Sequence, residues 1–355
     1  MKTDGNSFRG RGAAGNLPNR FEKLSLERDP EWHDAESVGP ATQFFKDATS
    51  SIINYNDSPD VGFDASVNPY RGCEHGCAYC YARPTHEYLG FSAGLDFETK
   101  IMVKENAPAL LRRELAAPHW KPQVLAMSGV TDCYQPVERR LKITRGCLEV
   151  LAEFRNPVGI VTKNHLVTRD VDFLSELARH RAAVVFISVT TLDSSIAEAM
   201  EPRASLPAHR LAAIETLARA GVPVGVLVAP VVPGLTDHET PSILAAAGKA
   251  GARFAGYVVL RLPWAVRPLF EDWLTRHAPG QKEKVLNRIR ALRDGKLNET
   301  KFGSRMSGEG LFAEQIAQMF EVARRRAGFG ERGPELSIAA FRRPAGAQLE
   351  LFGER

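Results

Sequence analysis

Short apolar runs alternate with amphipathic stretches through the middle of the chain. The apolar runs are rich in Val and Ile and do not alternate with polar residues, as in strands covered on both faces. They predict strands at residues 124–127, 158–162, 183–189, 222–228 and 256–260. The stretches between them have helical periodicity and predict helices at residues 107–116, 143–154, 170–179, 208–220 and 242–250. This alternation indicates parallel strands joined by crossover helices.

A further strand, just before Cys73, would bring the series to about six β/α units. The pattern therefore predicts an α/β core over residues 66–267, either a partial barrel or an open doubly wound sheet, because periodicity does not separate the two. An irregular N-terminal extension, residues 1–65, precedes the core and is punctuated by Gly, Asn, Asp and Pro.

The strand signal stops near residue 268, and a helical C-terminal extension is expected from there to residue 335. Within it, the periodicity predicts helices at residues 284–292 and 312–326. The last segment, residues 336–355, is expected to be a tail with one strand at residues 336–341.

Composition and charge place the chain among soluble globular proteins. It has 355 residues, of which 44% are hydrophobic and 25% charged, with a net charge of +4 whose positive excess lies toward the C-terminal end. No apolar run approaches the roughly 18 residues of a membrane span, and the polar, Gly-rich start does not resemble a secretory signal. We therefore expect a cytoplasmic protein without membrane contact.

The strongest chemical signal is a group of three cysteines, Cys73, Cys77 and Cys80, with the spacing C-x3-C-x2-C. Thiolates bind iron–sulfur clusters and zinc, and an odd total of five cysteines does not form a disulfide framework. Three thiolates would hold three irons of a four-iron cluster and leave the fourth iron open. The alternative is a zinc site, with a fourth ligand from His75 or His86.

This spacing, the aromatic Tyr79 before the last cysteine and the β/α series that follows resemble the radical S-adenosylmethionine (SAM) enzymes. The resemblance covers residues 66 to about 265. It implies a partial (β/α)6 TIM-type barrel with a [4Fe-4S] cluster on Cys73, Cys77 and Cys80 and with SAM on the open iron. An electron from the reduced cluster, supplied by a reductant such as flavodoxin or ferredoxin, would cleave SAM to a 5′-deoxyadenosyl radical that abstracts a hydrogen atom.

Polar residues follow the other predicted strands, where ligands collect in such folds. They are Ser128, Thr131 and Asp132 after the second strand, Lys163 after the third, and Ser188 and Thr190 after the fourth. A small polar loop containing Ser128 would suit the amino group of methionine, a cation a carboxylate, and hydroxyls a carboxylate or ribose. The alternatives are a solvated lysine and the polar end of a strand.

These residues are similar to those of the spore photoproduct lyase branch of the family. That resemblance implies that Lys163 and Ser188 contact SAM, that Tyr79 lies near the adenine and, more loosely, that Thr131 and Asp132 contribute. Arg203 would contact SAM or substrate, or form a local salt bridge.

Cys133 follows the second strand and is expected to face the barrel mouth. The branch has a hydrogen-donor cysteine in the corresponding loop, before a T-S-D sequence, whereas Cys133 comes after Thr131 and Asp132. Cys133 is therefore a candidate hydrogen donor, with a packed thiol as the alternative.

The tail contains Gln-Leu-Glu-Leu-Phe, from Gln348 to Phe352. This peptide resembles the one by which bacterial repair and replication proteins dock on the DNA sliding clamp, although the same side chains would also pack on the barrel. Together with the branch resemblance, it predicts a radical SAM enzyme acting on DNA or another nucleic acid. The alternatives are a radical SAM enzyme on RNA, protein or a metabolite, and a zinc-stabilised, non-enzymatic nucleic-acid adaptor.

Overall fold

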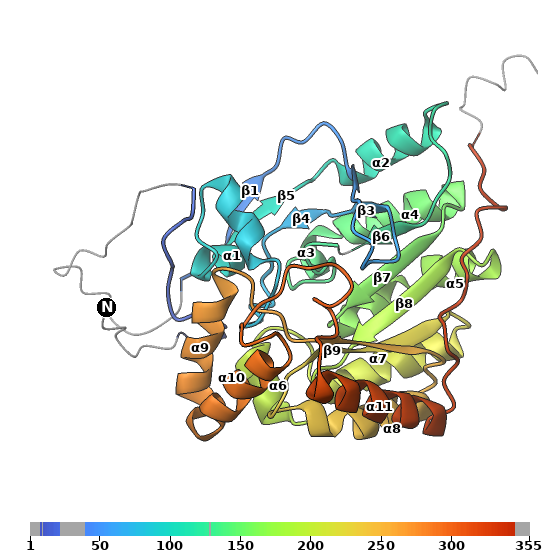
Figure 1. The fold of residues 1–355 in the computed structure, drawn as a ribbon. Helices are drawn as coiled ribbons and strands as arrows, with labels where there is room; N and C mark the ends of the chain where they lie inside the picture. Colours follow the sequence, from blue (N-terminus) through green and yellow to red (C-terminus); the bar gives the residue numbers. More distant parts are fainter. Residues whose placement is uncertain (1–7, 9, 22–39, 128, 345–355) are drawn as a thin grey trace, which may run out of the picture.

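The computed structural model describes residues 8, 10–21, 40–127 and 129–344. Its centre is a seven-stranded sheet in the order β10-β9-β8-β7-β6-β3-β2 (Figure 1). All neighbouring strands are parallel except β2, which pairs antiparallel with β3. The strands are β2 Ile53–Tyr55, β3 Ala65–Val67, β6 Leu125–Met127, β7 Val158–Thr162, β8 Ala183–Ser188, β9 Val224–Val231 and β10 Ala255–Val259.

Helices connect successive parallel strands and pack on the outer face of the sheet (Figure 1). The six parallel strands and their crossovers form the partial (β/α)6 barrel that the sequence resemblance implies. Their apolar side chains are buried, as the continuous Val and Ile runs require. The connecting helices are α2 Ala107–Ala116, α4 Ile143–Phe154, α5 Val171–Arg179, α6 Ser194–Met200, α7 Pro207–Arg219 and α8 Thr240–Lys249.

The strand before the cysteine loop differs from the prediction. The first barrel strand is β3, and the residues directly before the loop form β4, Tyr70–Arg71, in a separate three-stranded sheet. In that sheet β5, Lys100–Val103, pairs with β4 and with β1, Gln43–Lys46. The N-terminal extension is thus less irregular than expected, because β1 and β2 belong to it. These strands are too short for a periodic signal, and their partners lie far along the chain.

Short helical elements surround the carboxyl ends of the strands. They are η1 Arg83–Leu89, α1 Leu95–Thr99, α3 Glu138–Leu141, η2 His165–Asp170 and η3 Asp237–Glu239. The C-terminal part adds α9 Val266–His277, η4 Pro279–Gln281, α10 Lys282–Ala291 and α11 Leu311–Arg326. Phe270 and Trp273 of α9 share a buried apolar cluster with Cys77 and Tyr79, so this part covers one side of the cysteine loop.

The predicted strand at residues 336–341 is wrong. Residues 330–343 instead run along the loops that precede the barrel strands, at the amino ends of those strands. The N–H groups of Gly330, Ser337 and Arg342 donate to the carbonyl oxygens of Arg253, Arg181 and Phe154, at 3.1, 2.9 and 2.9 Å. These N–H groups bond to carbonyl oxygens in loops and at the end of α4 and not to a neighbouring strand. In the described part of the chain, no helix is both long enough and apolar enough to cross a membrane.

Candidate active site

The cysteine loop follows β3 and β4 at the carboxyl ends of the barrel strands, where the topology predicts a ligand site. Cys73 and Cys77 are buried, and Cys80 is half-buried. The loop folds on its own backbone, since the N–H of Cys80 donates to the carbonyl oxygen of Cys77 at 3.2 Å. The N–H of Ala78 donates to the carbonyl oxygen of Met200 at 2.9 Å, which attaches the loop to the end of α6.

A fully buried ion pair supports the loop from behind. The guanidinium of Arg83 donates to the carbonyl oxygens of Cys77 at 2.9 Å and Gly76 at 3.1 Å, and lies 2.5 Å from the carboxylate of Glu98. That carboxylate also accepts the N–H groups of Gly12 at 3.1 Å and Ala13 at 2.9 Å. The N-terminal segment, residues 10–21, is therefore part of the support of the cysteine loop.

Backbone packs directly on backbone where this segment meets the loop. A Cβ atom on Gly12 would lie 1.7 Å from the carbonyl oxygen of Gly76. Gly76 itself has a φ of 67°, which favours glycine. Only a residue without a side chain permits the N-terminal segment to reach Glu98.

The three thiols have the chemistry of cluster ligands. Burial raises the pKa of Cys73 well above its ordinary value, and Asp132 and the other two thiols raise it further; burial also raises the pKa of Cys77 and Cys80. The positive charge of iron would offset this cost, so cluster binding would release the thiol protons. Among the described residues, no three His, Cys, Asp or Glu side chains are arranged around a single metal ion, and a cluster does not need this because each thiolate binds a different iron.

Among the described residues, neither histidine offered as a fourth zinc ligand joins the three cysteines in a group that could hold a metal ion. The ring nitrogens of His75 lie 3.0 Å from the side-chain amide of Asn164 and 3.4 Å from a carboxylate oxygen of Asp132. Nε2 of His86 lies 3.0 Å from the carbonyl oxygen of Lys100, and its ring packs on Phe91 and Phe97. These contacts argue against the zinc alternative.

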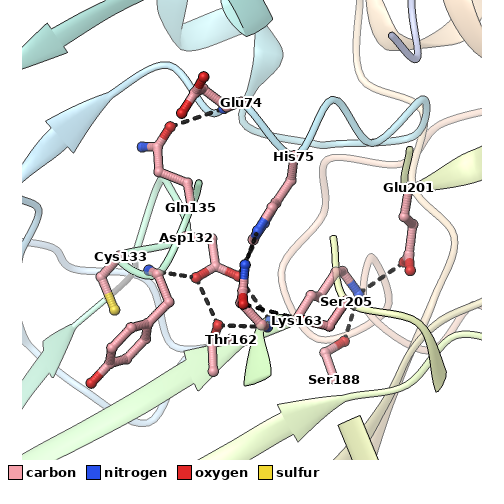
Figure 2. Close-up of polar contacts among 12 residues, drawn as sticks. Glu74, His75, Asp132, Cys133, Gln135, Thr162, Lys163, Ser188, Glu201 and Ser205 are labelled. Carbon is pink, nitrogen blue, oxygen red and sulfur yellow. Dashed lines mark hydrogen bonds and ion pairs between the residues drawn. The ribbon is translucent and has the colours of Figure 1, made fainter. Parts of the chain in front are cut away.

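Two predicted SAM contacts, Lys163 and Ser188, meet beside the loop (Figure 2). The ammonium of Lys163 donates to the hydroxyl of Ser188 at 2.7 Å and to the carbonyl oxygen of Ala229 at 2.9 Å. It also lies 3.2 Å from the carboxylate of Glu201 and 3.3 Å from the hydroxyl of Thr190. The ends of β7 and β8 thus present a cation with adjacent hydroxyls, a suitable receptor for a carboxylate.

Glu201 is the buried centre of this network, and sequence reasoning missed it. Its carboxylate forms an ion pair with Arg210 and accepts hydrogen bonds from the hydroxyls of Tyr79 and, at 2.8 Å, Thr190. Arg210 and Lys163 together hold the pKa of Glu201 far below its ordinary value, although burial alone would raise it. The partners lie between 9 and 122 residues from Glu201 and at no regular spacing, so no sequence signal could reveal the network.

Asp132 and Thr131 connect loops to one another. The carboxylate of Asp132 accepts from the Thr162 hydroxyl and the Lys163 N–H, both at 2.8 Å, and also contacts His75 (Figure 2). The hydroxyl of Thr131 donates to the carbonyl oxygen of Tyr70 at 3.2 Å. Their predicted contact with SAM has no support in these positions, and Ser128 lies outside the described residues.

The surroundings of Cys133 and Arg203 agree with the alternatives given above, a packed thiol and a local salt bridge. Cys133 is 0% exposed in the main hydrophobic core and does not face the mouth as expected, which favours a packed thiol. Its side chain points away from the Lys163 network in Figure 2. Arg203 forms an ion pair with Glu74 at 3.0 Å, next to Cys73 in sequence. A contact of Arg203 with SAM or substrate stays a prediction.

Comparisons with known proteins agree with this geometry. The family model described as "Radical SAM superfamily" matches residues 67–247. An uncharacterized protein of Mycobacterium tuberculosis is 38% identical over 283 residues, which are 78% of this chain and 80% of that protein. An uncharacterized protein of Methanocaldococcus jannaschii is 30% identical over 173 residues, 49% of this chain and 62% of that protein.

Among solved structures, a spore photoproduct lyase variant with bound AdoMet and dinucleoside spore photoproduct has a similar fold. The TM-score is 0.58 at 16% sequence identity, over 81% of this chain and 80% of that chain. Spore photoproduct lyase complexed with dinucleoside spore photoproduct gives a TM-score of 0.57 at 15% identity, with the same coverage.

Proposed function

Because the chain belongs to the radical SAM superfamily, we propose that it cleaves SAM reductively to abstract a hydrogen atom from a nucleic-acid substrate, a DNA lesion above all. Its cofactors are a [4Fe-4S] cluster and SAM, the two that enzymes of this family use. The observation that carries the proposal is the pairing of Lys163 with Ser188 beside the three cysteines, at the strand ends.

The cofactors supply the difficult chemistry: one electron from the reduced cluster cleaves SAM to methionine and a 5′-deoxyadenosyl radical. The protein binds and positions. Cys73, Cys77 and Cys80 would hold the cluster, and the ammonium of Lys163 with the hydroxyl of Ser188 would hold the carboxylate of SAM.

Glu201 keeps Lys163 in place for this role. Its ionised carboxylate attracts the ammonium of Lys163, and Arg210 forms a second ion pair with the same carboxylate. The tyrosine ring of Tyr79, whose hydroxyl donates to the same carboxylate, has the Lys163 ammonium 5.6 Å from its centroid. A buried network of ion pairs and hydrogen bonds of this kind would hold a small ligand without rearrangement.

The nucleic-acid part of the proposal is supported by fold similarity to spore photoproduct lyase, which binds a dinucleoside spore photoproduct. RNA, protein and metabolites are the alternatives for the substrate. Docking on a sliding clamp through residues 348–352 stays a prediction and lies outside the described residues. Reduction by a flavodoxin or ferredoxin and a cytoplasmic location also stay predictions.

The decisive experiment measures 5′-deoxyadenosine formation. The protein is reconstituted anaerobically with iron and sulfide, reduced with dithionite and given SAM, beside a Cys80→Ala variant. Cysteine-dependent product supports the chemistry, and stimulation by ultraviolet-irradiated DNA but not by irradiated RNA supports the substrate. A protein that binds one zinc and no acid-labile sulfide would indicate the adaptor instead.

A further inference from the structure

Three arginines gather where β10 ends. Arg261 follows the strand, and Arg293 and Arg305 belong to the segment after α10 that packs against it. The N–H of Val259 donates to the carbonyl oxygen of Met306 at 2.8 Å, which joins that segment to the barrel. Arg293 donates to the carbonyl oxygens of Leu260 at 2.8 Å and Arg305 at 3.2 Å.

Only one of the three arginines has a carboxylate partner among the described residues. Arg305 forms an ion pair with Asp60 and donates to the hydroxyl of Ser58 at 2.5 Å. Arg261 and Arg293 form no ion pair with a described residue, and the hydrogen bond found for Arg261 goes to the sulfur of Met306 at 3.6 Å. Burial and the charge of Arg261 lower the pKa of Arg293 to about 10. Positive charge therefore accumulates in this corner at an energetic cost.

Buried polar atoms lacking a hydrogen-bond partner in the described part of the chain also gather here. They include Nε of Arg261 and Nε of Arg293, whose side chain belongs to a residue only 2% exposed. Oδ1 of Asn298 and Oγ of Ser304, in the same segment, are also buried without a hydrogen-bond partner among the described residues. Buried polar groups are normally paired, so several unpaired ones in one corner indicate a bound group.

The corner lies close to the cysteine loop. Tyr81 follows Cys80, and its hydroxyl donates to the carbonyl oxygen of Gly129 at 2.9 Å. Leu260 and Leu262, which flank Arg261 in the sequence, belong to the buried apolar cluster that contains Cys77 and Tyr79. Tyr81 is 54% exposed, so its ring is accessible to a ligand. Arg261 thus lies near the side chain that borders the cluster ligands.

Exposed aromatic rings accompany the charges. Phe302 is 53% exposed, and the guanidinium of Arg305 lies 4.4 Å from its ring centroid. Guanidinium groups match phosphate oxygens in geometry, and exposed rings stack on nucleobases. A carboxylate ligand would use the cations but would leave the rings without a role.

We propose that Arg261, Arg293 and Arg305 form a phosphodiester-binding site that holds the nucleic-acid substrate beside the cysteine loop, with Tyr81 and Phe302 as stacking surfaces. Arg261 takes the phosphate oxygens, because Arg305 is paired with Asp60 and Arg293 donates to backbone carbonyls. This inference rests on the proposed function and specifies how its substrate binds.

The test compares the reconstituted wild-type protein with Arg261→Gln. The probe is a fluorescein-labelled single-stranded oligodeoxynucleotide, followed by anisotropy at several salt concentrations. We expect Arg261→Gln to weaken binding about tenfold and to reduce the salt slope by about one. Arg261→Lys should keep the slope but bind more weakly than wild type, because it retains the charge and loses the fork geometry. Arg219→Gln, an exposed change on α7, should bind as wild type.

Substrate-free 5′-deoxyadenosine formation and cluster content are measured on the same samples. Product from all variants shows that the fold and the proposed chemistry are intact, so a binding change is then specific to the site. Equal affinities and salt slopes for wild type and Arg261→Gln would overturn the phosphodiester site. A wild-type protein that forms 5′-deoxyadenosine but does not bind the oligonucleotide at about 50 mM salt would overturn it too, and would leave the SAM chemistry standing.

Discussion

The ammonium nitrogen of Lys163 lies 2.7 Å from the hydroxyl oxygen of Ser188, and that hydroxyl in turn donates to the carbonyl oxygen of Ala229 at 2.9 Å. These contacts join the ends of two neighbouring barrel strands, β7 and β8, to Ala229 in β9. It gives the site one fixed cation beside the three cysteines.

Replacing Lys163 with Met should weaken SAM binding about 10- to 100-fold, because a charge-assisted hydrogen bond to the carboxylate is lost. Ser188→Ala should weaken it less, since the ammonium remains. Equilibrium dialysis of labelled SAM against the cluster-loaded protein measures both. Unchanged affinity in Lys163→Met, with cluster content intact, would remove Lys163 from the SAM site.

The buried pair of Arg83 and Glu98 should be essential to the cysteine loop. Glu98→Gln leaves the Arg83 charge without a partner and should destabilise the fold by about 3–5 kcal/mol, with loss of bound iron. Glu176→Gln, which breaks an exposed pair with Arg179, should cost less than about 1 kcal/mol. Urea unfolding and iron analysis distinguish them, and equal effects would contradict the assigned support.

Two glycines of the N-terminal segment form a matched pair. Gly12→Ala should displace this segment from the loop, because its Cβ would overlap the Gly76 carbonyl, whereas Gly15→Ala meets nothing within 4 Å. We expect faster proteolysis of the segment and faster loss of the cluster in air for Gly12→Ala alone. Identical proteolysis rates would show that the segment does not pack as described.

His86 should make stability depend on pH. Burial lowers its pKa from 6.5 to about 4, so the unfolded chain takes up a proton that the folded protein does not. This contribution is complete above about pH 6.5 and is lost as the pH falls toward about 4, to the order of 3 kcal/mol. Anaerobic unfolding in urea at several pH values measures the slope.

His86→Gln retains a donor for the Lys100 carbonyl and should flatten that dependence. His119→Gln, an exposed change, should leave the slope as in wild type. A slope that survives in His86→Gln would assign the dependence to other groups.

Cys133→Ala should lower the thermal midpoint and leave 5′-deoxyadenosine formation unchanged, since the side chain lies in the main core. Removal of a buried sulfur costs about 1 kcal/mol. Loss of product turnover with normal SAM cleavage would instead support the donor role. Cys147→Ala, in the same core, is the matched control.

Periodicity predicts the barrel well because each strand and helix carries its own apolar pattern. The strands β7 to β10 and the helices α2 and α4 lie at or near the expected residues. The small sheet of β1, β4 and β5 escapes this reasoning. Its strands contain two to four residues, and β1 pairs with β5 across more than fifty residues of sequence.

For the site, strand ends predict location better than function. The positions after β7 and β8 do bring Lys163, Ser188 and Thr190 together. Asp132 lies in the same region, yet its carboxylate accepts hydrogen bonds from Thr162 and Lys163 and contacts His75. Which polar group faces a ligand and which satisfies a neighbouring loop depends on three-dimensional hydrogen bonding, for which one sequence contains no local signal.

Residues 330–343 lie at the amino ends of the barrel strands, whereas the cysteine loop lies at the carboxyl ends. This segment fastens the loops before β10, β8 and β7, and Arg343 then donates to the carbonyl oxygens of Ala117 and Trp120, before β6. The described chain therefore departs from the side opposite the cysteine loop. A partner that binds the chain beyond Pro344 would therefore be attached at the amino ends of the strands, opposite the proposed active site.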